Sequence, residues 1–354
     1  MKEKWFKPAV INMEGYVSPP QREFLAKLNQ NENPFDVPQE LKDELGEKAK
    51  NLDWNRYPEN GSPELRAKLG KWHDIEPGQI LLGSGSNQIL QSLFTAIVGK
   101  GDKVITSPPV FSLYDMLTNL LDAEIIPVLQ EPGTPFPIQS FLETIKRENP
   151  QLVVLCSPNN PTGYEMPLDD LETICQQSEC LVFYDEAYGE FTENVARPLL
   201  EKYDNLIISR TFSKAFSLAG LRFGYFMAAR PIIQQLEKIN IPYNVNLFTE
   251  MVACHLIDNR EFMAKHVQYL IDERARLYTR MAAIPGIRVY PSAANFLLFG
   301  SDRDIDLFAE LKNRGILVRN VSSYPLLAGH QRVSVGNRKE NDLFLDKLSE
   351  IMED

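Results

Sequence analysis

Lys214 lies in a segment whose neighbours suit covalent chemistry on a phosphorylated ligand. It stands in Thr-Phe-Ser-Lys, followed by a run of small residues. A lysine held in a packed loop can lose its proton and attack a carbonyl, as a Schiff-base lysine must. Thr211 and Ser213 before it, with Arg222 after it, could form a cup for a phosphate. Taken alone, a lysine is more often a solvated surface residue, so the hypothesis depends on these neighbours.

Polar residues also follow two of the apolar runs. Asp185 ends Leu-Val-Phe-Tyr-Asp, and Tyr188 comes three positions later. A carboxylate at a buried strand end is costly unless a cation, such as a protonated ring nitrogen, pairs with it. Asp185 could equally cap a turn or a helix. Asn159 and Asn160 are turn formers by residue type, but an Asn amide could also donate to a ligand oxygen.

Residues 83–88, Gly-Ser-Gly-Ser-Asn-Gln, follow an apolar run and open a helical pattern. The backbone N–H groups of this loop could hold a phosphate at a helix N-terminus, although alone the loop indicates only a tight turn. It is not Gly-x-Gly-x-x-Gly, and no acidic residue stands at the expected distance, so a dinucleotide site is weakly supported. Phe111 and Tyr114 would normally belong to the core, unless a flat ring must be stacked.

Together these groups suit a flat, phosphorylated ring that carries an aldehyde. The lysine would bind the aldehyde and the carboxylate the ring nitrogen. Phenol and amide groups would contact a ring oxygen, and hydroxyls with an arginine would hold the phosphate. Pyridoxal phosphate (PLP) has all of these parts.

The elements that must position these groups alternate between strands and helices. Between about residues 80 and 230, runs rich in Val, Ile and Leu are separated by helical patterns. Several runs are apolar throughout, as in strands covered on both faces. The pattern predicts an α/β fold, with a mostly parallel sheet between helices. In such sheets ligands bind beyond the carboxyl ends of strands, so the polar segments after four strands could converge on one crevice. The expected strands are residues 79–83, 103–107, 124–128, 152–156, 181–185, 205–210 and 222–228.

The pattern changes after residue 230, and 354 residues are too many for one ordinary core. Residues 259–284 form a charged amphipathic stretch that is long enough to link two domains. Four short apolar runs beyond it alternate with helical patterns, as in a compact α+β unit. We therefore expect an N-terminal arm that also joins the small domain (1–45), a large PLP-binding domain (46–260) and a small C-terminal domain (261–354).

Composition excludes several classes of protein. The excess of 48 acidic over 37 basic residues argues against nucleic-acid or anionic-membrane binding, but not against a small phosphorylated ligand. Four cysteines without CxxC spacing favour a reducing cytoplasm, and four scattered histidines make a metal site improbable. No run approaches the roughly 20 apolar residues that span a bilayer, and the N-terminus has no apolar signal core. We expect a cytoplasmic, soluble protein that binds no metal.

Seven segments, in order, resemble the aspartate-aminotransferase-like PLP enzymes of fold type I, and in particular the histidinol-phosphate aminotransferases. They are LNQNENP, NRYPENG, SPNNPTG, LVFYDEAYGEF, RTFSKAFSLAGLRFGY, PYNVN and QRVSVG. The resemblance covers the chain from about residue 10 to the end. It implies a transaminase of histidine biosynthesis that acts on histidinol phosphate and 2-oxoglutarate in a ping-pong cycle.

The resemblance also implies roles for individual residues. Lys214 would form the Schiff base with PLP, Asp185 would pair with the pyridine nitrogen, and Tyr188 and Asn160 would contact the 3-oxygen. Phe111 would stack on the ring, where many relatives have Tyr. The cofactor phosphate would be held by residues from two segments, namely Ser86, Asn87, Thr211, Ser213 and Arg222.

Further residues would serve the substrate and the partner subunit. Tyr57 resembles the tyrosine that family members lend to the phosphate of the neighbouring subunit, which implies a homodimer with shared active sites. Arg332 resembles the arginine that grips an α-carboxylate bidentately, as in glutamate. Arg319 and Tyr16 match positions expected to hold the substrate phosphate, and Asn244 could line the same pocket.

Other functions remain open on the same scaffold. One is an aromatic amino acid aminotransferase, and another is a threonine-phosphate decarboxylase of the cobalamin pathway. Outside these enzymes, a non-catalytic PLP-sensing regulator would carry an added DNA-binding module, for which the arm is too short and the charge too negative. An NAD enzyme is weakened by the lack of Gly-x-Gly-x-x-Gly.

Overall fold

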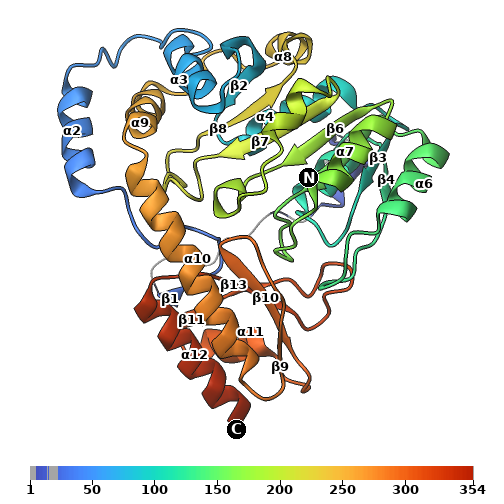
Figure 1. The fold of residues 1–354 in the computed structure, drawn as a ribbon, viewed down its shortest axis with the longest axis vertical. Helices are drawn as coiled ribbons and strands as arrows, with labels where there is room; N and C mark the ends of the chain where they lie inside the picture. Colours follow the sequence, from blue (N-terminus) through green and yellow to red (C-terminus); the bar gives the residue numbers. More distant parts are fainter. Residues whose placement is uncertain (1–4, 14, 16–22, 354) are drawn as a thin grey trace.

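The computed structural model describes residues 5–13, 15 and 23–353. Figure 1 shows a large sheet flanked by helices and, beneath it, a smaller unit. Helix α10 (Glu261–Ala282) runs from one to the other. Among the described residues, no helix is long and apolar enough to cross a membrane.

The large sheet has seven strands in the order β2-β8-β7-β6-β5-β3-β4. All seven expected strands are present, and the sheet is mostly parallel as predicted. Only β8 runs antiparallel, to its neighbours β2 and β7. The strands are β2 (Ile80–Gly83), β3 (Lys103–Thr106), β4 (Glu124–Pro127), β5 (Leu152–Cys156), β6 (Leu181–Asp185), β7 (Leu206–Thr211) and β8 (Gly224–Ala228).

Helices cover both faces of this sheet, which explains why several of its strands are apolar throughout. In β5, Val153 and Leu155 belong to one buried cluster, whereas Leu152 and Val154 belong to another. The first cluster includes residues of α3 (Pro63–His73), α6 (Ile138–Glu148), α7 (Leu168–Gln177) and α9 (Leu247–Asp258). The second includes residues of α4 (Ser86–Ile97), α5 (Leu113–Leu120) and α8 (Arg230–Glu237). Short 3-10 helices are η2 (Pro77–Gln79), η3 (Gly189–Phe191) and η4 (Arg197–Glu201).

The smaller unit is built on an antiparallel sheet in the order β12-β13-β10-β9. Its strands are β9 (Ile287–Val289), β10 (Phe296–Ser301), β12 (Arg319–Asn320) and β13 (Gln331–Ser334). The helices α10, α11 (Leu307–Asn313) and α12 (Arg338–Glu353) enclose its core.

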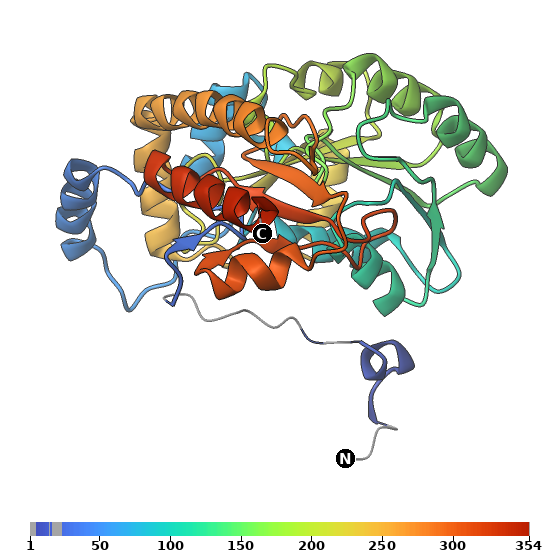
Figure 2. The same ribbon diagram turned by 90° about the horizontal axis from the view of Figure 1, so that it is seen from below.

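The N-terminal segment contributes a strand to the smaller unit. Strand β1 (Ala26–Lys27) pairs in parallel with β11 (Ile316–Leu317), and Figure 2 shows β1 beside the orange and red elements. Two helices lie in the same N-terminal part, α1 (Pro8–Ile11) and α2 (Gln39–Lys50). The residue limits proposed for the three domains remain predictions.

Candidate active site

Polar residues that follow β3, β6 and β7 meet at one edge of the large sheet. The Tyr114 hydroxyl, beyond β3, donates to Oδ2 of Asp185 at the end of β6, at 2.6 Å. The ammonium of Lys214, beyond β7, lies 6.0 Å from the centre of the Tyr188 ring, beyond β6. Segments separated in the sequence therefore converge on one crevice, because parallel strands end at the same edge.

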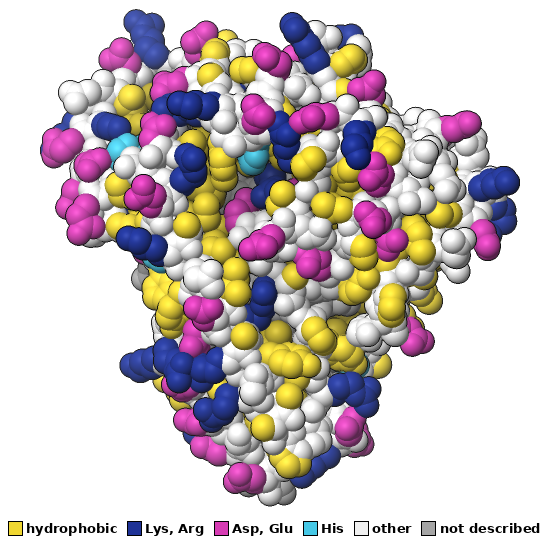
Figure 3. Space-filling model, viewed as in Figure 1, with side chains coloured by type: hydrophobic (Ala, Val, Ile, Leu, Met, Phe, Trp, Pro, Cys, Tyr) yellow, Lys and Arg dark blue, Asp and Glu magenta, His cyan; other side chains and the backbone are white. Residues whose placement is uncertain are grey.

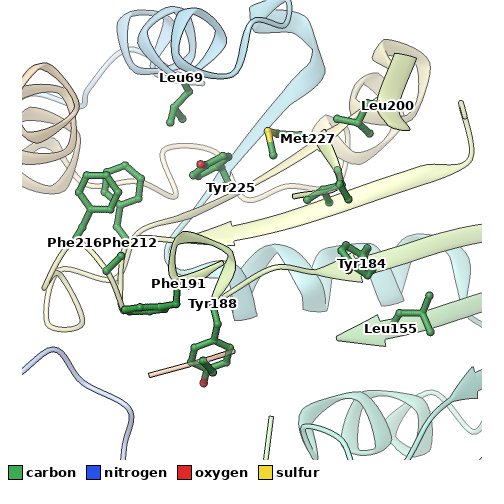
Figure 4. Packing of buried hydrophobic residues seen from close by; sticks show 14 of the residues in the cluster. Leu69, Leu155, Tyr184, Tyr188, Phe191, Leu200, Phe212, Phe216, Tyr225 and Met227 are labelled. Atoms are coloured by element: carbon green, nitrogen blue, oxygen red, sulfur yellow. The ribbon is translucent and has the colours of Figure 1, made fainter. Parts of the chain in front are cut away.

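The loop that carries Lys214 is fixed by two aromatic rings. Phe212 and Phe216 stack at 4.0 Å with an interplanar angle of 6° (Figure 4). The Nζ of Lys214 donates to the backbone oxygen of Gln30 at 3.0 Å. Burial lowers the pKa of Lys214 to about 8, and the positive charge of Arg332 acts in the same direction. Much of this amine is therefore unprotonated under mildly alkaline conditions, as a nucleophile requires.

Asp185 is a buried carboxylate, with 7% of its surface exposed. Besides the phenol of Tyr114, the backbone N–H of Ala187 donates to it, at 3.1 Å. Burial raises the pKa of Asp185, and these two hydrogen bonds oppose the rise. In the described part of the chain no cation pairs with it, so a protonated ring nitrogen would complete its environment. The contribution of Tyr114 was missed at the sequence level, because nothing in its neighbourhood distinguishes it from a core tyrosine.

Tyr188 is buried, and its ring packs edge-on against the ring of Phe296. Figure 4 shows its hydroxyl pointing away from the other labelled rings. Its hydroxyl oxygen accepts a hydrogen bond from Nδ2 of Asn31 at 2.8 Å. Asn160 accepts a hydrogen bond from the guanidinium of Arg332, which also donates to the backbone oxygen of Asn29 at 2.8 Å. The segment containing Asn29 and Asn31 was part of a recognised motif, but neither residue was predicted to reach the site.

The predicted phosphate cup is assembled beside the start of α4. A Cβ on Gly85, whose φ is 78°, would lie 2.8 Å from a guanidinium nitrogen of Arg222, so only glycine lets Arg222 approach this loop. Arg222 donates to the Ser213 hydroxyl at 3.3 Å, and the Thr211 hydroxyl donates to Ser213 at 3.0 Å. Helix α4 begins at Ser86 without a side-chain cap. The backbone amides of the first turn of α4 therefore lie near the guanidinium of Arg222 and the hydroxyls of Thr211 and Ser213. An anion would be stabilised between these groups.

The donor set fits PLP at every part of that molecule. A loop lysine with a lowered pKa suits the aldehyde, and a buried carboxylate without a cation suits the ring nitrogen. The uncapped helix start with Arg222 suits the phosphate. The buried carboxylate in particular would be costly in a purely structural role.

The family model of aminotransferase class I and II matches residues 25–348. The chain belongs to this family. It is 37% identical to the histidinol-phosphate aminotransferase of Chlorobaculum tepidum over 97% of this chain and 99% of that one. It is 35% identical to the protein of the same name from Caldanaerobacter subterraneus, over 92% and 93% of the two chains.

Solved structures agree in fold with this aminotransferase. The histidinol-phosphate aminotransferase of Sinorhizobium meliloti, determined in complex with pyridoxal-5'-phosphate, superimposes with a TM-score of 0.89. It is 24% identical and covers 98% of this chain and 97% of its own. The enzyme from Clostridium acetobutylicum gives a TM-score of 0.86 at 22% identity, over 93% and 99% of the chains.

Phe111 of this aminotransferase packs against Tyr114, whose hydroxyl contacts Asp185, and Asn244 lies beside the start of α4. The ring of Phe111 packs edge-on against Tyr114, with centroids 5.7 Å apart. Asn244 donates through Nδ2 to the backbone oxygen of Leu82 at 2.9 Å and to Gln88 at 2.8 Å. These contacts place Asn244 beside the start of α4. Its predicted contact with the substrate stays a prediction.

Arg319 and Arg332 of this aminotransferase lie directly opposite each other in the antiparallel pair β12–β13. Side chains of such a pair emerge on the same face of the sheet, and like charges there repel. Arg332 is only 8% exposed, so the repulsion is weakly screened. An anion between the two guanidinium groups would relieve it. Tyr16, predicted to join them, lies outside the described residues.

Tyr57 is 81% exposed, and its ring stacks on that of Tyr243 at 4.6 Å. Trp54 in the same loop is 69% exposed, and Ile241 is 63% exposed. Large apolar side chains gathered on a surface mark a contact with another molecule more often than a free surface. The position of Tyr57 therefore agrees with a residue that faces a partner subunit.

Proposed function

We propose that this protein is a PLP-dependent aminotransferase that interconverts histidinol phosphate and 2-oxoglutarate with imidazole-acetol phosphate and glutamate, in histidine biosynthesis. The observation that carries the substrate assignment is the cross-strand pair Arg319 and Arg332. Two arginines on one face can accept a phosphate from one substrate and a carboxylate from the other. Relatives 37% and 35% identical over nearly the whole chain bear the same name.

Each residue at the strand ends has a defined task in this reaction. PLP, when bound, supplies a ring that withdraws electrons from the substrate Cα. Lys214 would hold the cofactor aldehyde and, with its amine free, would be placed to take the proton from the substrate Cα as general base. Its pKa of about 8 suits this, because the amine is then basic and yet about half unprotonated near that pH. Asp185 would accept the ring N–H, while Tyr188 and Asn160 would donate to the 3-oxygen.

The remaining contacts orient the cofactor and exclude water. Phe111 would stack on the ring. The phosphate would be held by the groups around the start of α4, namely the backbone of Ser86 and Asn87 with Thr211, Ser213 and Arg222. Tyr16 and Asn244 stay predicted substrate contacts. Charges of both signs alternate over the face shown in Figure 3, which fits local binding of small anions better than binding of a polyanion.

We also propose that the enzyme is a homodimer in which Tyr57 reaches the cofactor phosphate of the other subunit. The exposed apolar surface around Trp54 and Tyr57 supports this arrangement. The four cysteines are unpaired, which favours a reducing compartment, and the proposed location is the cytoplasm.

A single-turnover experiment tests the substrate. The PLP-loaded protein is mixed with one amine at a time, without an oxo acid, and the absorbance of the cofactor is followed. Histidinol phosphate should convert the aldehyde form of the cofactor to its amine form within seconds, and phenylalanine should do so much more slowly. Rapid conversion by phenylalanine and none by histidinol phosphate would refute the assignment in favour of an aromatic aminotransferase.

A further inference from the structure

Asn31 connects the phenol of Tyr188 to the smaller unit. Its side chain is buried, with 1% of the residue exposed. Nδ2 donates to the Tyr188 hydroxyl oxygen at 2.8 Å, and the Ser334 hydroxyl donates to Oδ1 at 3.0 Å. Asn295 donates through Nδ2 to the backbone oxygen of Asn31 at 3.0 Å. The residue is thus held on three sides.

The hydrogen bonds of Ser334 determine which way the Asn31 amide faces. The backbone N–H of Asn31 donates to the Ser334 hydroxyl oxygen at 2.8 Å. The proton of that hydroxyl therefore remains available, and the side-chain oxygen of Asn31 is its acceptor. With the amide oxygen committed to Ser334, the NH2 group faces Tyr188.

A phenol has one proton to give and lone pairs to accept. Since the Asn31 amide already donates to the oxygen of Tyr188, the phenol proton has to point elsewhere. We propose that Asn31 is a positioning residue that directs the Tyr188 proton toward the 3-oxygen of bound PLP. The inference rests on the proposed function, in which Tyr188 contacts that oxygen. Burial raises the pKa of Tyr188 to about 12, so the phenol remains a donor at working pH.

The same short segment contacts two other groups of the site. The backbone oxygen of Gln30 accepts from Lys214, and that of Asn29 accepts from Arg332. Arg332 and Ser334 lie two positions apart on β13, so their side chains share a face. A substrate anion that shifts Arg332 would therefore act on the strand that orients Asn31.

The substitution Asn31→Asp reverses the donor without changing the shape of the side chain. Asn31 has a φ of 54°, which both Asn and Asp tolerate. A carboxylate oxygen in place of Nδ2 would accept the Tyr188 proton, and the cofactor would lose its donor. A hydrogen bond from Tyr188 to the 3-oxygen of PLP favours loss of the proton from the nearby Lys214 nitrogen. Without this hydrogen bond, the Lys214 nitrogen keeps its proton to higher pH.

The measurement is the pH titration of the visible absorption band of the PLP-loaded protein, without substrate. This band reports the protonation of the Lys214 nitrogen. The Tyr188→Phe and Asn31→Asp variants should each raise the pKa read from the band by about one unit or more, as expected for a lost hydrogen bond to a charged oxygen. Thermal unfolding of each variant checks that it is folded.

Asn31→Asp also adds a charge, and the double variant isolates its effect. In the Tyr188→Phe background the phenol is absent. Asn31→Asp should therefore change the pKa read from the band by less than half as much as it does in the wild type. Equal shifts in the two backgrounds would overturn the inference, since the effect would then be the charge alone. A band unmoved by Tyr188→Phe would overturn both the inference and the role of Tyr188, while the single-turnover assay tests the function independently.

Ser334→Ala gives a second test without added charge. It removes the hydroxyl that orients the amide, and it alters neither Tyr188 nor a predicted PLP contact. The band should move in the same direction by a smaller amount. If Asn31→Asp fails to fold, an unmoved band in Ser334→Ala overturns the inference.

Discussion

Tyr57 provides the sharpest test of how the active site is built, because subunit complementation can reveal which subunit it serves. The side chain is 81% exposed, so Tyr57→Ala should change the stability of the subunit by less than about 0.5 kcal/mol. Lys214→Ala removes the amine that binds the cofactor. If Tyr57 serves the partner's site, a heterodimer of the two variants contains one site with both residues intact.

The expected size of the effect follows from one hydrogen bond. A phenol that donates to a charged phosphate contributes about 1.5–3 kcal/mol. Its loss should therefore weaken PLP binding by about 10- to 100-fold. At a PLP concentration that saturates only the wild type, Tyr57→Ala should be nearly inactive, and Lys214→Ala should be inactive at any concentration.

The assay mixes the two variants, dissociates them and lets them reassociate at limiting PLP. Random pairing makes half of the dimers mixed, and one of their two sites is complete, so the pool should recover about a quarter of wild-type activity. Wild type diluted with Lys214→Ala serves as the control for reassociation. If the mixed pool has no more activity than the average of its two parents, Tyr57 serves its own subunit and the shared site is refuted.

Three further predictions concern the anion contacts and the lysine. Because only the unprotonated amine attacks, the cofactor-free protein should capture PLP faster as pH rises through about 8, and the rate should level off about one pH unit above that value. Stopped-flow absorbance would show this, and a rate still rising at pH 10 would contradict the lowered pKa. Arg222→Ala should raise the dissociation constant of PLP about 10- to 100-fold in a binding titration, and unchanged affinity would remove it from the phosphate cup. Arg319→Ala should raise the KM for histidinol phosphate about tenfold and that for glutamate less, whereas equal increases would deny it a role in discrimination.

Much of the fold could be predicted because its causes are local. Several runs of the large sheet are apolar throughout since both faces are covered, so these strands were recognisable without knowledge of their neighbours. Asp185 and Lys214 each follow such a run, and the edge where parallel strands end brings them together. The seven strands and their mostly parallel arrangement are confirmed.

The supporting shell of the site could not be predicted, because its contacts join residues far apart in the chain. Tyr114 resembles a core tyrosine until packing brings its hydroxyl to Asp185, 71 positions away. Asn31 reaches Tyr188 across 157 positions and Ser334 across 303. Asn244 likewise reaches Leu82 across 162 positions, and its predicted substrate contact stays a prediction.

The sequence by itself determined the class of chemistry and the elements that carry it, because residue type and hydrophobic periodicity are properties of short segments. The tertiary structure decided which donors face which acceptors. A hydrogen bond depends on distances within a few tenths of an ångström, and those are set by the packing of the whole chain. The direction of the Tyr188 proton, through Asn31 and Ser334, is therefore a property of the folded molecule alone.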